Sequence, residues 1–435
     1  MSLSIESYFL SYNKIFNYEV IIVGAGIAGI SAAKILDNNN ISNIVIEAND
    51  RLGGRAKKAP EIFGNWFDLG CSYLHEGEIN PFRTIAQSLK VPIDYQNGDI
   101  FSIEKTKYLF GEKTFLLNNK KKLKKSYNNF LVELNLYKEN IGDNHLSSCL
   151  NINDPNYPIL FDYLTGLNGI EAHLVSARDF ASVNEGKDLI IESGLANMID
   201  KWATGINLIL NNPVKQINWD REQIEITTKS NKYICKSVLL TVSNGILANE
   251  DIAFIPKLPD YKIQAINNLP MGILNKIGVL FEEGTFKDNQ LGWYVVTPDK
   301  YHNNISEIFS FEIRKKEKEH MIFFFGGKKG SDIENYPKKY YKKIIEFIKK
   351  QFGDKIEKNI IKLIHSSWGK DPYSKGAYSY ALPGHNFERD LLKKTLEKKV
   401  YFAGEATINN SYGTCHGAYI SGNHAANKII YDLKN

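Results

Sequence analysis

The residues with the clearest chemical meaning lie near the start of the chain, at Gly24, Gly26, Gly29 and Glu47. An apolar run at residues 18–23 leads into this glycine-rich turn, and a second run at residues 44–46 ends at the acid. The glycines allow a tight turn, a close backbone approach to a pyrophosphate, and close packing of helix on strand. The new helix directs its positive end at the phosphates, and Glu47 can accept hydrogen bonds from ribose hydroxyls. This order predicts a dinucleotide-binding βαβ unit.

The segment after Glu47 indicates which dinucleotide is bound. Residues 51–55 read RLGGR. In flavoproteins such a segment brings an arginine back onto the pyrophosphate, whereas a nicotinamide domain has no need of it. Arg55 is the better candidate, because the two preceding glycines let the backbone fold it inward. The alternative interpretation is a surface turn with two solvated arginines.

Length and charge limit the class of protein. The 435 residues suffice for a large core and two domains, and 43% hydrophobic with 24% charged residues is typical of a soluble globular chain. The net charge of +5 reflects lysine clusters at residues 120–125, 314–318 and 338–343. These alternate with apolar residues at roughly helical spacing, which favours solvated helix faces. We therefore expect no nucleic-acid partner.

Cysteine usage and the N-terminal segment bear on location. Cys71, Cys149, Cys235 and Cys415 show neither metal-ligand spacing nor a disulfide framework. The first 17 residues lack a cationic region followed by a long apolar stretch, and no run reaches the roughly 18 apolar residues of a membrane span. The sequence predicts a cytoplasmic protein without a metal site or a membrane span.

The dinucleotide fold is expected to be assembled from separated pieces. Residues 1–85, 195–250 and 396–435 would form an FAD-binding domain. The later pieces predict a helix at 195–202, strands at 206–210, 214–219, 223–228, 237–242 and 399–403, and a helix at 414–433. Residues 86–194 and 251–395 would form a substrate-binding domain inserted twice. The first insert reads as helix-rich, and the second predicts strands at 276–281, 305–312 and 321–325 and a basic helix at 337–352.

Five segments together carry a family resemblance. They are GAGIAG at 24–29 with Glu47 and RLGGR, FDLGCSYLHEGEINP at 67–81, LPMGILNKIGVLF at 269–281, WGKDPYSKGAYSY at 368–380, and YFAGEATINNSYGTCHGAYISG at 401–422. The chain resembles the flavin-containing amine oxidase family, which includes monoamine oxidases, polyamine oxidases and flavin-dependent histone lysine demethylases. Its motifs are most similar to those of polyamine oxidases.

The resemblance implies an α/β fold, with a Rossmann-type FAD-binding domain built from discontinuous segments. It also implies an α+β substrate domain, a mixed sheet flanked by helices. The active site would lie between the two domains, against the flavin ring. Boundaries between domains are where small-molecule pockets usually form.

The resemblance also implies cofactor contacts late in the chain. Gly404 and Glu405 would meet the ribityl or phosphate part of FAD. Thr414 and Cys415 would begin a helix whose N–H groups face the pyrimidine edge of the flavin, where negative charge builds on reduction.

Three further positions concern the cofactor. The backbone of Val214 would meet the adenine. Trp368 would pack near the flavin, although a plain core tryptophan fits equally well. Ala377 stands near the place where animal monoamine oxidases carry a cysteine bonded to flavin, so the FAD should be non-covalent.

Lys276 is the main catalytic candidate. The family places a lysine here that holds a water near flavin N5, and burial would lower the pKa of that lysine. The alternative is an exposed strand lysine.

Four residues are candidates for substrate contacts. Tyr378 resembles an aromatic residue that flanks the substrate amine, and Thr414 stands where a second aromatic wall is usual, which argues against a monoamine-oxidase-like site. His75 could hydrogen-bond a substrate nitrogen. Glu171 could hold a distal ammonium, or it could simply be a solvated glutamate.

The expected function is the FAD-dependent oxidation of a small-molecule amine, with hydride transfer to flavin, an imine and aldehyde as products, and hydrogen peroxide formed from molecular oxygen. Polyamine-like substrates are favoured. One alternative is an L-amino-acid oxidase or tryptophan monooxygenase, which needs an arginine for the carboxylate; Arg178 and Arg314 are candidates.

Another alternative is an FAD-binding protein that acts by partner recognition. A histone demethylase would need added chromatin-binding modules, for which 435 residues leave no room. The sequence leaves the oligomeric state open.

Overall fold

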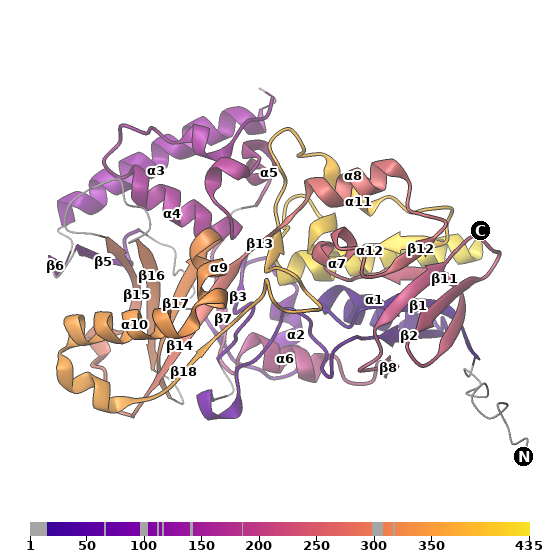
Figure 1. Cartoon of the computed structure of the whole chain (residues 1–435), viewed down its shortest axis with the longest axis horizontal. Helices are drawn as coiled ribbons and strands as arrows, with labels where there is room; N and C mark the ends of the chain where they lie inside the picture. Colours follow the sequence, from indigo (N-terminus) through magenta and orange to yellow (C-terminus); the bar gives the residue numbers. More distant parts are fainter. Residues whose placement is uncertain are drawn as a thin grey trace, which may run out of the picture.

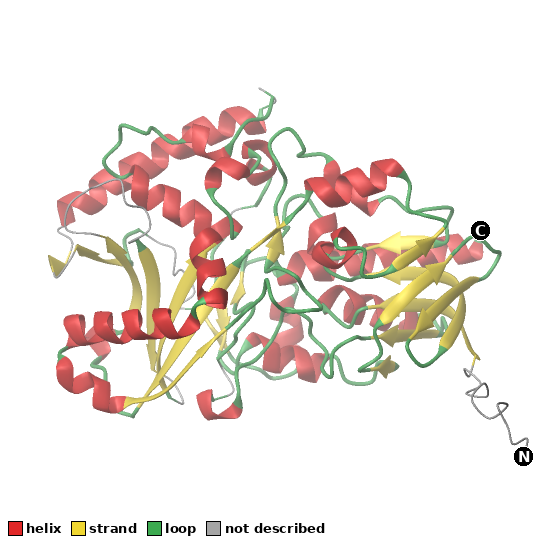
Figure 2. Cartoon of the chain, viewed as in Figure 1, coloured by secondary structure: helices red, strands yellow, loops and turns green. Residues whose placement is uncertain are grey.

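The structure is a computed structural model that describes residues 15–64, 67–95, 103–110, 113–114, 117–139, 142–184, 186–297, 308–315 and 318–435. It is organised around two large sheets at opposite ends of the molecule (Figures 1 and 2).

The first sheet collects strands from three separated parts of the chain. β1 (Ile15–Val23) pairs in parallel with β2 (Asn43–Ile46) on one side and β11 (Lys232–Leu240) on the other. The path through this sheet is β12-β9-β10-β11-β1-β2-β8, and β20 (Val400–Phe402) pairs with the end of β11. The other members are β8 (Leu208–Ile209), β9 (Val214–Asn218), β10 (Ile224–Thr228) and β12 (Ala253–Ile255). β2 is buried at every residue, as a parallel strand covered on both faces must be.

Two helices from opposite ends of the sequence pack together beside this sheet. α1 (Ile27–Asn38) follows the glycine turn, and α12 (Cys415–Lys434) is the last helix. A Cβ atom added to Gly422 would lie 2.3 Å from the carbonyl oxygen of Ala28, so only glycine permits this approach. The Ser31 hydroxyl also hydrogen-bonds to the carbonyl oxygen of Tyr419 across the same contact (3.0 Å).

The second sheet runs in the order β18-β14-β17-β16-β15-β5-β6 and is antiparallel except for the β5–β15 pair. Its strands are β5 (Lys107–Phe110), β6 (Lys113–Thr114), β14 (Leu274–Phe281), β15 (Gly292–Thr297), β16 (Phe309–Lys315), β17 (Glu319–Gly326) and β18 (Ile360–His365). α9 (Gly327–Asn335) and α10 (Pro337–Phe352) pack against it. α10 buries Ile344 and Ile348, four residues apart, while its lysines lie on the outside.

A helical layer lies above the second sheet in the view of Figure 1. It contains α3 (Leu117–Lys138), α4 (Tyr157–Asn168) and α5 (Ala177–Ala181). Their apolar residues form one cluster that also includes Tyr108 of β5 and Tyr380.

Smaller elements connect the two halves. One small sheet joins β3 (Tyr73–Leu74), β7 (Leu189–Ile191) and β4 (Ile93–Asp94), and another joins β13 (Met271–Gly272) to β19 (Tyr378–Ser379). The remaining α-helices are α2 (Phe82–Ser88), α6 (Leu195–Trp202), α7 (Asn244–Ala248), α8 (Asp260–Asn268) and α11 (Glu388–Lys393). Short 3-10 helices are Glu61–Phe63, Leu146–Cys149, Ala172–Leu174, Asp288–Gln290, Asp354–Asn359 and Glu405–Thr407. None of the described helices combines the length and apolar character needed to cross a bilayer.

The fold class expected from the sequence is confirmed. The helices predicted at 195–202 and 337–352 have the observed bounds of α6 and α10. The strand predicted at 305–312 is observed as β16 from Phe309, and residues 305–307 lie outside the described residues. The helix face predicted for the cluster at 314–318 is wrong for Arg314 and Lys315, which lie on β16, and residues 316–317 are outside the described residues. The domain division stays a prediction, and β12 joins the first sheet beyond the expected boundary at residue 250.

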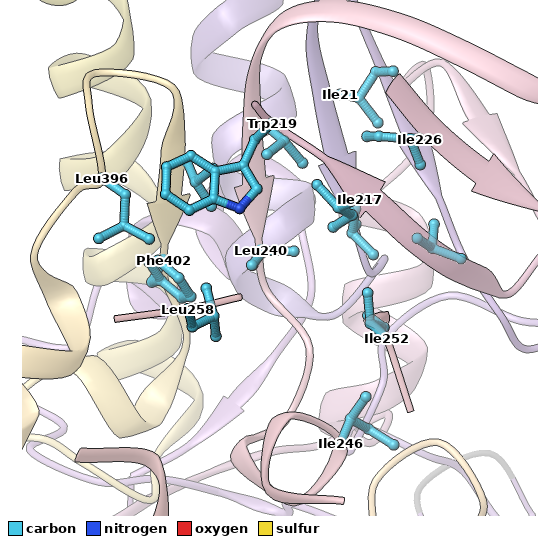
Figure 3. Packing of buried hydrophobic residues seen from close by; sticks show 14 of the residues in the cluster. Ile21, Ile217, Trp219, Ile226, Leu240, Ile246, Ile252, Leu258, Leu396 and Phe402 are labelled. Carbon is cyan, nitrogen blue, oxygen red and sulfur yellow. The ribbon is translucent and has the colours of Figure 1, made fainter. Parts of the chain in front are cut away.

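The core beside the first sheet contains a buried lysine. Trp219, Leu258, Leu396 and Phe402 pack together there (Figure 3), and the ammonium of Lys262 lies 4.2 Å from the Phe402 ring centroid. It donates to the carbonyl oxygens of Leu391, Leu392 and Lys394 at 2.6–2.8 Å, at the end of α11. Burial, together with the Lys394 charge, lowers the pKa of Lys262 to about 7. This side chain therefore caps the last carbonyls of α11.

We expect Lys262→Met to destabilise the protein, because three carbonyl oxygens lose their donor. The free energy of unfolding should fall by about 2 kcal/mol or more, measured by urea unfolding. Lys394→Ala is the matched control: it removes an exposed amine, keeps the carbonyl oxygen, and should change stability little. Equal stability of the two variants would contradict the capping role.

Candidate functional site

A single large cavity of about 1790 Å³ lies between the two halves of the described structure. Its wall includes residues from α1, β9, the loop before β3, α3, α4, β14, β17 and the start of α12. Pockets for one drug-sized ligand are usually about 300–1,000 Å³. The volume therefore allows a dinucleotide and a second molecule together.

One end of the cavity has the geometry of a dinucleotide cradle. Gly24 has φ +109°, and an added Cβ there would lie 2.9 Å from Thr241 Oγ1. A Cβ at Gly29 would lie 2.0 Å from the carbonyl oxygen of Gly24, so this glycine permits the close packing of α1 on β1. At Gly26, on the cavity wall, a Cβ would meet nothing within 4 Å, and no side chain caps α1 there. This open, positive helix end suits a phosphate.

Glu47 is buried at the same end and lies on the cavity wall. Its carboxylate accepts hydrogen bonds from the backbone N–H groups of Ala25 (2.6 Å) and Asn49 (2.8 Å). These bonds fix the orientation of the acid beside the glycine turn. Val214 lies on the wall nearby, at the start of β9.

Glu405 is the centre of a buried polar network. Arg55 donates from Nη1 to Glu405 Oε1 (2.8 Å) and to the carbonyl oxygen of Ala377 (2.9 Å). The Ser379 hydroxyl (2.7 Å) and the Gly413 N–H (3.0 Å) donate to Glu405 Oε2. Burial alone would raise the pKa of Glu405, but the charges of Arg55 and Arg389 and these hydrogen bonds hold the pKa below its usual value.

Around this network the backbone comes close to the cavity. Gly404 has φ +136° and open space where a Cβ would stand, and Trp368, Ala377 and Cys415 also lie on the wall. Trp368 is only 6% exposed. The predicted cofactor residues 24, 26, 47, 55, 214, 368, 404, 405, 414 and 415 thus come together on one cavity, and their contacts with FAD stay predictions.

Lys276 lies on β14, is 5% exposed, and lines the cavity. Its ammonium donates to the carbonyl oxygens of Asp68 (2.9 Å) and Gly70 (2.5 Å) and to Ser72 Oγ (2.5 Å). Burial lowers the pKa of Lys276 to about 8, although the Asp68 carboxylate partly opposes this effect. The lysine can therefore gain or lose a proton near neutral pH.

Asp68 links this lysine to a helix. Its carboxylate accepts from the N–H groups of Leu195 (2.8 Å) and Ala196 (3.1 Å) at the start of α6. Burial raises the pKa of Asp68 to about 6, against the opposing effects of Lys276 and these hydrogen bonds. Burial thus moves the pKa values of Lys276 and Asp68 towards each other.

Two tyrosines, Tyr378 and Tyr412, lie on the cavity wall. The Tyr378 hydroxyl donates to the carbonyl oxygen of Gly166 (2.7 Å), so it is already engaged. Tyr412, which the sequence analysis did not single out, also lies on the wall, and the nearby Tyr378 contributes to raising the pKa of Tyr412. The Arg389 guanidinium lies 3.7 Å from the ring centroid of Tyr412. Thr414 uses its hydroxyl to cap α12 by accepting from the Gly417 N–H (3.0 Å). Tyr412 is thus a second aromatic residue beside the threonine.

His75 lies on the cavity wall with a 40% exposed side chain, and its Nδ1 is 2.8 Å from Asp188 Oδ1. Partial loss of solvation would lower the pKa of His75, but the charge and hydrogen bond of Asp188, together with the charge of Glu76, raise the pKa above its usual value. The next residue, Glu76, is held by His416 (2.9 Å) and by the Ser411 hydroxyl (3.0 Å). Asp188 carried no sequence signal, since it lies 113 positions from His75 in the chain.

Three sequence candidates lie off the described cavity wall: Glu171, Arg178 and Arg314. Glu171 accepts from the Lys328 N–H (2.8 Å) and so supports the start of α9. Arg314 contacts Glu312 (2.6 Å) and donates to the Tyr73 hydroxyl (3.0 Å). Neither Arg314 nor Arg178 reaches the cavity, and the arginines on the described wall are Arg51 and Arg55, at the dinucleotide end.

Two known protein families match the chain, one over its N-terminal segment and one over most of the remainder. The sequence profile described as "Flavin containing amine oxidoreductase" matches residues 139–430, and that of the NAD(P)-binding Rossmann-like domain matches residues 22–89. Polyamine oxidase 3 of Oryza sativa subsp. japonica is 29% identical over 93% of this chain and 88% of its own length. Lysine-specific histone demethylase 2 of Homo sapiens is 26% identical over 95% of this chain, which spans only 53% of that protein.

Solved structures share the fold. Cyclohexylamine oxidase from Brevibacterium oxydans superposes with a TM-score of 0.78 at 20% identity, covering 96% of this chain and 100% of its own. A redesigned putrescine oxidase gives a TM-score of 0.75 at 18% identity with the same coverage. At these identities the likeness concerns the fold alone.

The network around Glu405 predicts a specific response to acid. Because the folded-state pKa lies below the unfolded value, the carboxylate stabilises the fold at neutral pH. That contribution is lost as the pH falls from about 4.3 through the folded pKa. Urea unfolding between pH 7 and pH 3 should therefore show a shallower pH dependence for Glu405→Gln than for the unchanged protein. Glu397→Gln, at an exposed position, should keep the original slope; identical slopes for all three proteins would exclude the role of Glu405.

Proposed function

This chain belongs to the family of flavin containing amine oxidoreductases, and we propose that it oxidises the C–N bond of an amine with non-covalent FAD as its cofactor. The observation that carries the proposal is the convergence of the glycine turn, Glu405 and Lys276 on one cavity. The dinucleotide end and the buried lysine lie on the same continuous wall, as a reaction between FAD and a second molecule requires.

The residues of the wall fit FAD. Gly26 and Gly404 leave open space at backbone positions, the start of α1 supplies a positive end for phosphates, and Glu47 is oriented beside it. When bound, FAD would act as the acceptor of a hydride equivalent from the amine. The amine would become an imine, which water hydrolyses to an aldehyde. The electrons would pass to molecular oxygen, which is reduced to hydrogen peroxide.

The walls near the substrate favour the reactive form of an amine. Tyr378, Tyr412, Trp293 and Phe324 all contribute surface to the cavity. Removal of an amine from water into such surroundings lowers its pKa and favours its neutral form. We propose that Tyr378 and Tyr412 contact the amine with their rings and that His75 hydrogen-bonds a substrate nitrogen.

Lys276 would move a proton in the oxidative part of the cycle. Three oxygen atoms accept hydrogen bonds from the Lys276 ammonium. Because the pKa of Lys276 is about 8, the ammonium can lose a proton close to neutral pH. In its charged form it would also stabilise negative charge that develops on oxygen.

The substrate class proposed is polyamine-like. The similarity to polyamine oxidase 3 supports it. An amino-acid substrate is less well supported, because Arg178 and Arg314 lie off the cavity wall and the described wall arginines belong to the dinucleotide end. A flavin-binding protein without amine chemistry is the remaining alternative.

An amine screen tests the proposed function. Under anaerobic conditions, the flavin absorbance of the purified yellow protein should bleach with at least one of putrescine, spermidine, spermine, their acetylated forms or simple monoamines. Peroxide should appear when air is admitted, and acid should release free FAD. Bleaching by amino acids alone would favour the amino-acid oxidase. Flavin that no amine or amino acid bleaches would favour the binding protein.

Lys276→Met should slow flavin reoxidation at least about tenfold, because the buried ammonium is lost. The rate for the unchanged protein should fall as the pH rises past about 8, where Lys276 loses its proton, and the variant should lack this inflection. Stopped-flow mixing with oxygen measures both. Lys362→Met, on the exposed side of β18, is the control and should behave like the unchanged protein. An unaltered pH profile in the Lys276 variant would remove the lysine from the mechanism.

A further inference from the structure

Two free cysteines from opposite ends of the chain meet on the cavity wall. Cys71 lies in the loop before β3, and Cys415 is the first residue of α12. Both side chains are partly buried and pack against the same apolar cluster, which includes Ile27 and Leu74. A hydrogen bond joins the two thiols. The sulfur atoms are therefore neighbours in space, although no local pattern in the sequence relates them.

The backbone around Cys71 is held in place from several sides. Its N–H donates to the carbonyl oxygen of Arg55 (3.3 Å). The residues on either side of it, Gly70 and Ser72, accept hydrogen bonds from the Lys276 ammonium (2.5 Å each). On the other side of the pair, α12 begins directly at Cys415 and has a side-chain cap. The two thiols are thus positioned by the fold before any reaction takes place.

The hydrogen bond between the thiols gives them different roles. This bond, followed by burial, raises the pKa of Cys415 well above its usual value. Cys415 therefore keeps its proton and donates to the sulfur of Cys71. The charge of Cys71 also acts on the Lys276 ammonium, so the Cys71 sulfur lies near a cation. A nearby cation stabilises the sulfur anion that attacks an oxidant, which assigns the attack to Cys71 and the second step to Cys415.

The other two cysteines have different surroundings. Cys149 and Cys235 are only 3% and 1% exposed, and neither belongs to the described cavity wall. Burial raises the pKa of Cys149 to about 12 and raises that of Cys235 as well. Thiols buried in apolar surroundings are inert. These two residues therefore serve as internal controls for the reactivity of the pair on the wall.

We propose that Cys71 and Cys415 form a peroxide-reactive dithiol that closes to a reversible disulfide on the cavity wall. The Cys71 sulfur attacks one oxygen of hydrogen peroxide, the O–O bond breaks, and water leaves, so that Cys71 becomes a sulfenic acid. The Cys415 sulfur then displaces the hydroxyl group, which takes the Cys415 proton and leaves as a second water. Two electrons pass from the thiols to the peroxide, and an added dithiol restores both thiols by exchange.

The supply of peroxide rests on the proposed function, whereas the reaction of the thiols with added peroxide does not. Gly70 and Ser72 hold the ammonium of Lys276, so the dithiol lies beside the lysine proposed to act in reoxidation. Peroxide formed in this cavity would meet the dithiol before it reaches solvent. The enzyme would then be modified by its own product during turnover.

Added hydrogen peroxide tests the dithiol directly. Purified holoenzyme is treated with a small molar excess of peroxide, the remaining thiols are blocked with N-ethylmaleimide, and non-reducing digests are mapped by mass spectrometry. We expect a peptide pair linked through Cys71 and Cys415, blocking reagent on the other two of the four cysteines, and loss of the link after dithiothreitol. Failure to find this pair, or a link through Cys149 or Cys235, would overturn the inference.

Single substitutions test the order of the two steps. Cys415→Ser should stop the reaction at the sulfenic acid of Cys71, which dimedone labels, because the second sulfur is absent. Cys71→Ser should leave Cys415 as an unlabelled thiol. Cys149→Ala is the matched control and should form the linked pair as the unchanged protein does. FAD content and urea unfolding establish that the variants are folded. Dimedone on Cys415 in the Cys71→Ser protein would contradict the assigned order, and mapping of the unchanged protein needs no variant.

A turnover experiment separates this inference from the proposed function. An amine that bleaches the flavin is supplied in air together with catalase, which removes peroxide from bulk solution, and the linked pair should still form. Loss of the link under these conditions would overturn the internal supply of peroxide. If added peroxide links Cys71 to Cys415 but no amine reduces the flavin, the proposed function fails and the dithiol stands. If amine turnover releases peroxide but added peroxide gives no link, only this inference fails.

Discussion

The buried carboxylate of Glu405 is the contact on which the site depends. It joins Arg55 from the N-terminal segment, Ser379 from the second half and Gly413 from the C-terminal motif. A buried charge is tolerated only when it is paired and fully hydrogen-bonded. All three segments must therefore be in place for the Glu405 carboxylate to keep its full set of hydrogen bonds. This requirement fixes the backbone around the cavity.

Burial also sets the pKa values of Lys276 and Asp68. The pKa of Lys276 is lowered to about 8 and that of Asp68 is raised to about 6, so two groups that titrate far apart in water lie within about two units in the protein. Asp68 also holds the start of α6 through two backbone N–H groups. Lys276 is thereby anchored to the scaffold through the Asp68 segment.

The sequence predicted what depends on local pattern. The glycine turn, the bounds of α6 and α10, and the placement of Lys276 on a strand follow from spacing and periodicity over a few residues. Asp188 was missed because its partner His75 lies 113 positions away, and Tyr412 was missed because no local pattern records that its ring lies against the Arg389 guanidinium. For Glu171 the sequence left open a contact with a distal ammonium or a solvated side chain, and no local pattern indicated that its carboxylate accepts from the backbone N–H of Lys328. The apolar face of α3 was hidden among lysines, and only its packing against α4 and α5 shows it as a wall.

The approach of Gly422 to Ala28 has a consequence for biogenesis. α1 is synthesised well before α12, the helix that packs against it and lines the same cavity. Domains generally fold as units during synthesis, with N-terminal parts first. The side of α1 that packs on α12 therefore stays uncovered until residue 422 has been synthesised, so this part of the core closes only after most of the described chain has left the ribosome.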